Sequence, residues 1–224
     1  MKTIKLAPSI LTADFSKLAD EIQAIEKGGA DLVHLDIMDG QFVPPITFGA
    51  DIVSAISKIT NLPLEVHLMV MNPERHIESF APAVKTINIH FESSNEIAKT
   101  IDEIHRLGCD AGICINPETP VTVIKNFLEI AEQVIVMTIN PGWGGQKMMP
   151  EQLNKVMELR KIIENSDYAT QIEIDGGVKI ENIPICVQSG ADILVCGSSV
   201  YNDQNQPEEN LANLRDAISQ QRSF

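Results

Sequence analysis

The chain alternates between two hydrophobic periods from one end to the other, and this alternation constrains its fold more than any other feature. Strands rich in β-branched residues are expected wherever a short apolar run lies between turn residues. Eight such runs occur: Ile4–Ile10, Leu32–Met38, Leu64–Val70, Thr86–Phe91, Ala111–Asn116, Gln133–Thr138, Gln171–Asp175 and Ile193–Gly197. The segments between them carry apolar residues at helical spacing, so we predict a parallel sheet with right-handed crossovers.

The number of these units favours a closed sheet. The 224 residues, divided by eight, give about 28 residues per strand-and-helix unit. No linker, low-complexity tract or change of composition divides the chain. We therefore predict an α/β protein with a single (β/α)8 TIM barrel domain over residues 1–224, rather than an open doubly wound sheet.

The composition narrows the possible partners. The formal net charge is −14, with 17 Lys and Arg against 31 Asp and Glu, which argues against a nucleic acid or an anionic membrane as partner. The four cysteines form no CxxC pair, so we expect free buried thiols and a reducing compartment. Because the sequence shows neither an apolar leader nor a run of about 18 apolar residues, we expect a cytoplasmic protein without a signal peptide.

Polar residues share one face of three of the expected strands, near the carboxyl ends where barrel enzymes carry their active sites. Side chains alternate along a strand, so the aliphatic residues of these strands face the helices and the polar residues face the barrel interior. The residues that we expect to point inward are His34, Asp36, Glu65, His67, Glu173 and Asp175.

Two imidazoles and two carboxylates in one enclosed volume predict a metal site. Each residue alone is better explained by ordinary hydrogen bonding, but buried unpaired carboxylates are costly and these strands bring no Lys or Arg. The set suits a divalent Zn, Fe, Mn or Co ion, and its members are His34, Asp36, His67 and Asp175. We expect Glu65 and Glu173 to hydrogen-bond to the ligands. Such an ion could polarise a ketone and its neighbouring hydroxyl, while one carboxylate removes a proton and the other returns it.

Three strand ends lead into glycine-rich turns, which favour a phosphate site. Glycine lets backbone amides approach an anion, and barrels frequently hold phosphate after their last two strands. Such turns would bind an anion without Lys or Arg. The candidate contacts are Gly142, Gly144, Gly145, Gly176, Gly177, Gly197 and Ser198.

Several further polar, aromatic and sulfur-containing residues lie near the strand ends. Trp143 lies in the first glycine-rich turn and is a candidate lid residue. Met38, Met69 and Met137 lie late in their strands, and the pattern alone favours ordinary packing. For His90 and Glu92, at the end of another strand, the sequence indicates no partner.

These residues lie in segments that resemble the ribulose-phosphate 3-epimerase family, in order and over nearly the whole chain. The most specific stretches are His34–Gly40, which reads His-x-Asp-x-Met-Asp-Gly, and Asn140–Gln146, which reads Asn-Pro-Gly-x-Gly-Gly-Gln. The other matching segments are Ala7–Phe15, Gln41–Pro44, Val66–Met69, Glu173–Val178, Gly190–Asp192 and Gly197–Ser198.

The resemblance implies a barrel of the ribulose-phosphate-binding type and the interconversion of D-ribulose 5-phosphate and D-xylulose 5-phosphate, a step of the pentose phosphate pathway. It implies that Asp36 and Asp175 exchange protons on opposite faces of a metal-stabilised cis-enediolate, with one divalent ion and no organic cofactor. It further implies a homo-oligomer, either a dimer or a hexamer.

The resemblance also assigns roles to the remaining candidates. The ion would be held by residues matching His34, Asp36, His67 and Asp175. Ser9, His67, Trp143 and Asp175 would contact the substrate, and the glycine-rich turns would hold its phosphate. Met38, Met69 and Met137 would cap the enediolate, which replaces the packing role favoured above.

The chain departs from the family pattern at the expected mouth of the site. Pro45 stands where the family usually has Asn, Trp143 replaces a more common Phe, and Lys147–Met149 also differs. These departures leave the sugar open, so a D-allulose-6-phosphate 3-epimerase is the alternative. A metal-dependent sugar-phosphate aldolase and a non-catalytic sugar-phosphate-binding protein are the further alternatives.

Overall fold

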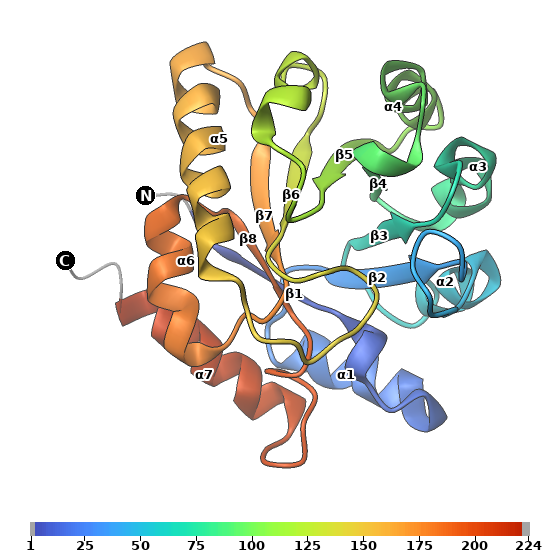
Figure 1. Ribbon diagram of the computed structural model, residues 1–224. Helices are drawn as coiled ribbons and strands as arrows, with labels where there is room; N and C mark the ends of the chain where they lie inside the picture. Colours follow the sequence, from blue (N-terminus) through green and yellow to red (C-terminus); the bar gives the residue numbers. More distant parts are fainter. Residues whose placement is uncertain (1–2, 221–224) are drawn as a thin grey trace.

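A computed structural model of the protein describes residues 3–220, in which eight parallel strands form a barrel surrounded by helices (Figure 1). The strands are β1 (Lys5–Pro8), β2 (Val33–Met38), β3 (Leu64–Met69), β4 (Thr86–His90), β5 (Asp110–Ile115), β6 (Gln133–Met137), β7 (Gln171–Asp175) and β8 (Ile193–Cys196). The helices are α1 (Leu18–Lys27), α2 (Ala50–Ile56), α3 (Ile77–Phe80), α4 (Ile97–Arg106), α5 (Leu153–Ser166), α6 (Ile183–Ser189) and α7 (Pro207–Gln220). The predicted (β/α)8 architecture is confirmed.

The barrel closes between its first two strands. The ladder runs from β1 through β8 and back down to β2, with every pair parallel. β1 and β2 then meet through a bridge between Ser9 and His34 and through the bond that the Asp31 amide donates to the Leu6 carbonyl at 3.0 Å. Closure therefore places the end of β1 beside the candidate metal ligands of β2.

The crossover between β5 and β6 differs from the prediction of a helix in every unit. Within the described residues it contains two short 3-10 turns, Val121–Val123 and Lys125–Phe127, and no α-helix. β-branched residues fill the first turn of this segment, and they lower its helix propensity. Val121, Ile124 and Leu128 are nevertheless buried, so the turns cover the sheet as a helix would.

Each strand presents an aliphatic side to the helices and a more polar side to the barrel axis. On β2, Val33, Leu35 and Ile37 belong to the main hydrophobic core, whereas the alternate residues His34 and Asp36 are buried in the interior. The parity predicted for the strand is therefore confirmed. Burial of the aliphatic side holds the polar side in register.

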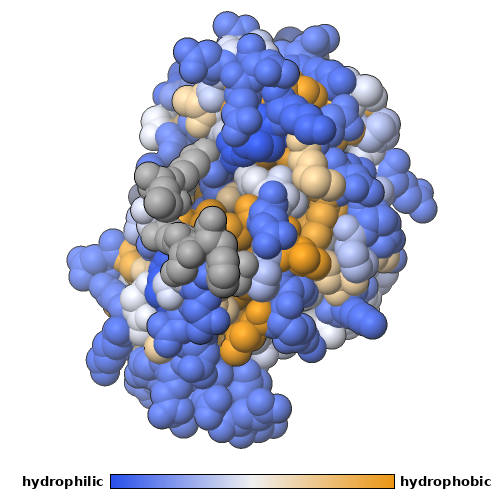
Figure 2. Space-filling model, turned by 90° about the vertical axis from the view of Figure 1, so that its left-hand side faces the viewer, coloured by the Kyte–Doolittle hydropathy of each residue, from blue (hydrophilic) through white to orange (hydrophobic). Residues whose placement is uncertain are grey.

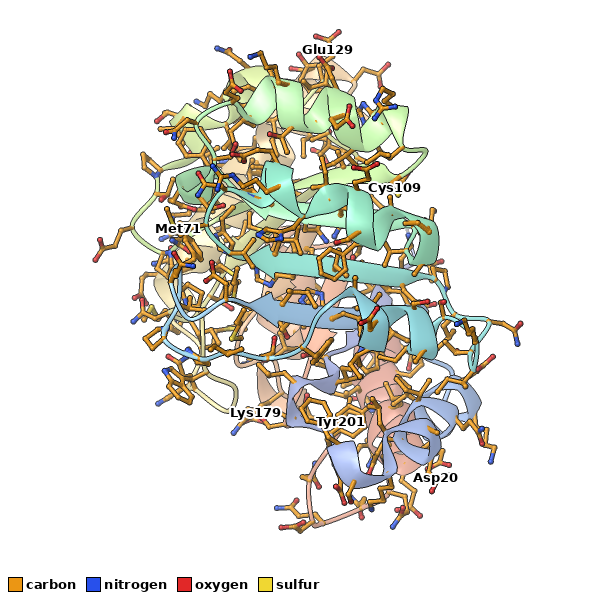
Figure 3. All side chains as sticks on the ribbon, turned by 90° about the vertical axis from the view of Figure 1, so that its right-hand side faces the viewer. Asp20, Met71, Cys109, Glu129, Lys179 and Tyr201 are labelled. Carbon is orange, nitrogen blue, oxygen red and sulfur yellow. The ribbon has the colours of Figure 1, made fainter. Side chains whose placement is uncertain are left out.

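The carboxyl ends of the strands share one end of the barrel. Figure 3 shows Met71 and Lys179, which follow β3 and β7, at the same end, while Cys109, which precedes β5, lies toward the other. Loops that carry the predicted site residues are thus brought together although they are far apart in sequence.

The surface and the cysteines bear on two further predictions. The side formed by α5, α6 and α7 is mostly hydrophilic, with hydrophobic residues gathered near its middle (Figure 2), and Met157 and Ile185 are partly exposed on α5 and α6. All four cysteines are free and buried, as predicted. Within residues 3–220, every helix is too short or too polar to cross a membrane.

Leu68→Ala on β3 tests the main hydrophobic core, which lies between the strands and the helices. The Leu68 side chain is fully buried in the main hydrophobic core, so we expect the free energy of unfolding to fall by about 2–5 kcal/mol. Urea unfolding followed by circular dichroism measures the change. The control Met157→Ala, at a partly exposed position on α5, should change it by less than about 1 kcal/mol, and equal losses in both variants would contradict the assigned core.

Candidate active site

Four side chains from three strands converge at the carboxyl end of the barrel. His34 and Asp36 come from β2, His67 from β3 and Asp175 from β7, and one ligand atom of each lies within 4.8 Å of the others. His67 Nδ1 lies 3.0 Å from Asp36 Oδ1 and 3.4 Å from Asp175 Oδ2. His34 Nε2 lies 3.3 Å and 3.9 Å from the same two oxygens. The structure thus brings together the four residues that the sequence singles out as metal ligands.

The chemistry of this cluster fits a divalent cation. His34 Nε2 is buried without a hydrogen-bond partner among the described residues and faces the two carboxylates. Burial alone would raise the pKa of Asp36, but the neighbouring His34 imidazole outweighs burial and the pKa is lowered. A buried nitrogen that has no hydrogen-bond partner among the described residues and faces two carboxylates suits a cation with nitrogen and oxygen ligands.

Below the cluster, buried carboxyl groups lie beside the other ring nitrogen of His34, Nδ1. His34 Nδ1 lies 2.7 Å from Glu65 Oε1 and 3.2 Å from Glu173 Oε1. Burial, together with the nearby Glu65 carboxylate, raises the pKa of Glu173 to about 8. The Gln133 amide donates to both carboxyl groups. Glu65 therefore makes the predicted hydrogen bond to His34, whereas Glu173 Oε1 lies beside the ring with no hydrogen-bond partner among the described residues. The arrangement leaves His34 Nε2 directed at the cluster.

Ser9 connects β1 to the cluster. Its hydroxyl donates to Asp36 Oδ2 at 2.6 Å, and it accepts a bond from the Leu11 amide at 3.2 Å. The Asp36 oxygen that faces His34 and His67 is the other one, Oδ1. Ser9 therefore holds the orientation of the carboxylate.

Above the cluster lies a hollow of about 520 Å³, open solvent at its mouth included. Asp36 and Asp175 form part of its floor, and Met38, Met69 and Met137 are buried in its wall. The described residues that line it include no Lys or Arg. The lining also includes Ser9, Gly142, Trp143, Gly144, Gly145, Gly176, Gly177, Gly197 and Ser198. Every predicted substrate contact except His67 lines this hollow, and direct contact between His67 and substrate stays a prediction.

The glycines of the turn after β7 are required by close packing. Gly176 and Gly177 have positive φ angles of 126° and 66°. A Cβ on Gly177 would stand 2.4 Å from the Met148 amide nitrogen, so a larger residue would push the two loops apart. Across the mouth, the Gln146 side chain donates to the Asn140 and Trp143 carbonyls at 2.8 Å each. Both turns are thereby held in fixed shapes around the hollow.

Sequence reasoning missed Thr12. Its side chain lies 2.8 Å from the position that a Cβ would take on Gly144 and 3.3 Å from the position for Gly197. Its hydroxyl oxygen is buried and has no hydrogen-bond partner among the described residues. Thr12 follows β1 in a 3-10 turn, Ile10–Thr12, and no strand periodicity covers such a position.

Sequence reasoning also found no partner for His90 and Glu92, whereas the structure joins them to the cluster. His90 Nε2 lies 2.8 Å from His67 Nε2, and His90 Nδ1 lies 3.2 Å from Glu92 Oε2. Burial lowers the pKa of His90 to about 4. The alternation of polar and aliphatic residues along β4 puts His90 on the inward face, so the rule that located His67 could have located His90 as well.

Trp143 and Pro45, the two positions at which we expect single-residue departures from the family pattern, both belong to or contact the glycine-rich turn after β6. Trp143 lines the hollow and is 62% exposed. Pro45 Cδ lies 3.5 Å from the position that a Cβ would take on Gly142, so the loop after β2 packs against the glycine-rich turn after β6. A lid role for Trp143 stays a prediction.

Asp39 ties the loop after β2 to the loop after β3. Its Oδ1 accepts from the amides of Gln41 and Phe42 at 2.8 and 2.9 Å, and its Oδ2 accepts from the Met71 amide at 2.9 Å. Partial burial alone would raise the pKa of Asp39, but these three amides outweigh it and lower the pKa. The second aspartate of the His34–Gly40 stretch thus shapes the mouth.

Comparison with known proteins agrees with this site. A family model described as the ribulose-phosphate 3 epimerase family matches residues 5–201. The ribulose-phosphate 3-epimerase of Bacillus subtilis (strain 168) is 45% identical over 205 residues, which cover 91% of this chain and 94% of the relative. The chloroplastic ribulose-5-phosphate-3-epimerase of Arabidopsis thaliana is 39% identical over 208 residues, which cover 92% of this chain and 74% of the relative.

Solved structures of lower similarity share the fold. KGPDC from Streptococcus mutans superimposes with a TM-score of 0.74 at 11% identity, covering 98% of this chain and 99% of that one. A 3-hexulose-6-phosphate synthase superimposes with a TM-score of 0.70 at 17% identity, covering 97% and 100%. At such identities the likeness concerns the barrel alone.

Asp39→Asn tests whether the Asp39 carboxylate holds together the loops after β2 and β3. An amide offers one acceptor oxygen to three backbone donors, so we expect the free energy of unfolding at neutral pH to fall by about 1–2 kcal/mol. In the parent protein the lowered pKa of Asp39 stabilises the fold above its ordinary value of 3.8, and this contribution is lost as the pH falls through the folded-state pKa. The difference between the two proteins should therefore shrink toward about pH 4 and below.

Urea titrations at neutral and acidic pH measure that difference. Asp20→Asn on the exposed side of α1 is the control and should be nearly neutral at both. A constant deficit for Asp39→Asn at every pH would contradict the assigned role of the carboxylate.

Proposed function

The chain belongs to the ribulose-phosphate 3-epimerase family, and from this premise we propose that it interconverts D-ribulose 5-phosphate and D-xylulose 5-phosphate by inversion at C3. The observation that carries the proposal is the pair of carboxylates, Asp36 and Asp175, in a hollow that glycine-rich turns also line. The carboxylates supply proton carriers and the turns supply a place for a phosphate. A 3-epimerase of a ketose phosphate needs both.

We infer that a divalent ion, Zn, Fe, Mn or Co, is held by His34 Nε2, Asp36 Oδ1, His67 Nδ1 and Asp175 Oδ2. The support is the approach of these atoms to within 4.8 Å of one another and the lack, within the described part of the chain, of a hydrogen-bond partner for His34 Nε2. When bound, such an ion polarises the C2 carbonyl and the adjacent hydroxyl and so lowers the barrier to removal of the C3 proton. No organic cofactor is required.

The two aspartates carry the proton. Asp36, held by the Ser9 hydroxyl, takes the C3 proton from one epimer, and the electrons of the C3–H bond form the enediolate. Asp175 then gives a proton to C3 from the opposite face, so the configuration inverts. Asp36 finishes protonated and Asp175 ionised, and the reverse reaction uses the same groups in exchanged roles.

The remaining residues bind and enclose the substrate. The turns containing Gly142–Gly145, Gly176–Gly177 and Gly197–Ser198 hold the phosphate through backbone amides, which avoids any need for Lys or Arg in a chain of net charge −14. Met38, Met69 and Met137 cover the planar intermediate with apolar surface, which keeps water from its carbon atoms. Trp143 closes the mouth.

We further propose one barrel domain over the whole chain, a cytoplasmic location and a homo-oligomer, either a dimer or a hexamer. Four buried thiols without disulfides support a reducing compartment. The partly exposed apolar side chains of α5 and α6 are compatible with contact between copies.

Asp36→Asn and Asp175→Asn test the two-carboxylate mechanism. We expect each to lower the epimerisation rate by about 100- to 10,000-fold, because each removes one proton carrier. Exchange of the C3 hydrogen with deuterated water should survive for one epimer in Asp36→Asn and for the other epimer in Asp175→Asn. Mass spectrometry of each sugar phosphate measures the exchange, with Asp20→Asn as control. Near-normal turnover in either variant would rule out this mechanism.

Removal of the metal tests the ligand set. Dialysis against a chelator should lower the activity by at least about 100-fold, and adding back Zn²⁺, Mn²⁺, Fe²⁺ or Co²⁺ should restore it. The metal content per chain is measured by atomic emission on the same samples. Full activity in protein shown to be metal-free would refute metal dependence while leaving the family assignment intact.

A further inference from the structure

We propose that His90 and Glu92 are positioning residues for His67: they fix its proton on Nε2 through a hydrogen-bonded chain, so that the Nδ1 lone pair is directed at the cation. The inference rests on the proposed function, because it takes His67 as a metal ligand. It adds two residues from β4 and the turn after it to a centre otherwise built from β2, β3 and β7.

The orientation of His67 identifies which nitrogen faces the cation. Nδ1 is the atom that lies 3.0 Å from Asp36 Oδ1 and 3.4 Å from Asp175 Oδ2. A neutral imidazole that binds a metal through Nδ1 must carry its proton on Nε2. The partner of Nε2 therefore decides whether the ligand is ready to bind.

That partner is His90. The two Nε2 atoms lie 2.8 Å apart, and the imidazole rings are stacked with centroids 4.9 Å apart. Two ring nitrogens at hydrogen-bond distance share one proton, so when His67 donates, His90 accepts. Both rings are fully buried, and water cannot replace either one.

Glu92 sets the direction of the hydrogen bonds that link these side chains. With its Nε2 accepting, His90 carries its own proton on Nδ1, which lies 3.2 Å from Glu92 Oε2. An ionised carboxylate only accepts, and hydrogen bonds from His90, Thr119 and the Asn116 amide lower the pKa of Glu92 to about 2 although burial opposes this. The two hydrogen bonds therefore run in one direction, with His67 donating to His90 and His90 donating to Glu92.

Glu92 is itself held in place by the neighbouring strand. Its Oε1 accepts from the Asn116 amide at 2.8 Å and from the Thr119 hydroxyl, both in the segment that follows β5. On the other side, the Phe42 ring packs against the His90 ring with centroids 4.7 Å apart. These contacts leave the His90 ring little freedom to rotate.

The other candidate histidine ligand is supported in a comparable way. His34 points Nε2 at the cluster, and its Nδ1 lies 2.7 Å from Glu65 Oε1. Both imidazoles thus have a carboxylate behind the nitrogen that faces away from the cluster, directly for His34 and through a second imidazole for His67. Hydrogen-bonded carboxylates of this kind orient metal-ligating histidines and raise their basicity.

A second cation between His67, His90 and the nearby Cys114 is the competing explanation, because ligand atoms of these three residues also lie within 4.8 Å of one another. Two nitrogens bound to one tetrahedral ion at ordinary bond lengths stand roughly 3.3 Å apart. The observed 2.8 Å between the Nε2 atoms favours the hydrogen bond.

The test is the affinity of the metal-free protein for Co²⁺, measured by competition with a chromophoric chelator. His90→Phe keeps the ring packing but removes both nitrogens, and we expect about 10- to 100-fold weaker binding. His90→Gln retains an acceptor for His67 and should recover most of the loss. Glu92→Gln should weaken binding less than His90→Phe. The control is His105→Phe, since His105 pairs with Glu132 on the surface and should leave the affinity unchanged.

The outcomes separate this inference from the proposed function. Parent protein that holds one Co²⁺ per chain, with weaker binding in His90→Phe and recovery in His90→Gln, supports the inference. Equal affinities for the parent protein and all His90 and Glu92 variants overturn it and leave the proposed function standing. Parent protein that binds no metal overturns the inference together with the proposed metal site, and leaves the family assignment intact. Two ions per protein molecule, falling to one in Cys114→Ser, overturn the hydrogen bonding proposed between His67 and His90. If His90→Phe does not fold, Glu92→Gln and Thr119→Val carry the test.

Discussion

Burial of carboxylates that have no Lys or Arg partner among the described residues is the constraint on which the rest of this structure depends. Asp36, Glu65, Glu173 and Asp175 all lie in the barrel interior, and the groups beside them are imidazoles, an amide and a hydroxyl. Buried negative charge is costly unless it is compensated. Shared protons relieve part of that cost lower in the barrel, where Glu173 has a raised pKa. At the carboxyl end, His34 Nε2 has no hydrogen-bond partner within residues 3–220 and is available to bind a compensating cation.

The barrel stabilises this polar interior through its outer hydrophobic core and through the closure of its sheet. Aliphatic side chains on the outer faces of the strands pack under the helices and form the main hydrophobic core, which holds the sheet together around its polar residues. A closed sheet also surrounds the charged groups on all sides, and this lowers the local dielectric and strengthens each hydrogen bond. The same closure brings Ser9, at the end of the first strand, to the Asp36 carboxylate.

The site residues that could be predicted all lie on strands whose polar and aliphatic residues alternate. His34, Asp36, His67 and Asp175 were found because polar residues alternate with aliphatic ones, and alternation fixes the face of a strand regardless of what lies opposite. His90 obeys the same rule, but its meaning depends on a partner 23 positions away, which one strand cannot reveal. The prediction of a helix between β5 and β6 was wrong. Two 3-10 turns bury the apolar side chains of that segment against the sheet, so the apolar spacing alone did not distinguish them from an α-helix.

By itself the sequence determined the order of the elements, the inward and outward faces of the strands and the residue types available at their ends, because these follow from local periodicity and turn chemistry. Only the tertiary structure decided which nitrogen of each histidine faces the carboxylates, which oxygen of Asp36 is taken by Ser9, and that Thr12, His90 and Glu92 belong to the site. Those features depend on distances between strands and loops far apart in the chain, and such distances are set by barrel closure and side-chain packing rather than by any local pattern.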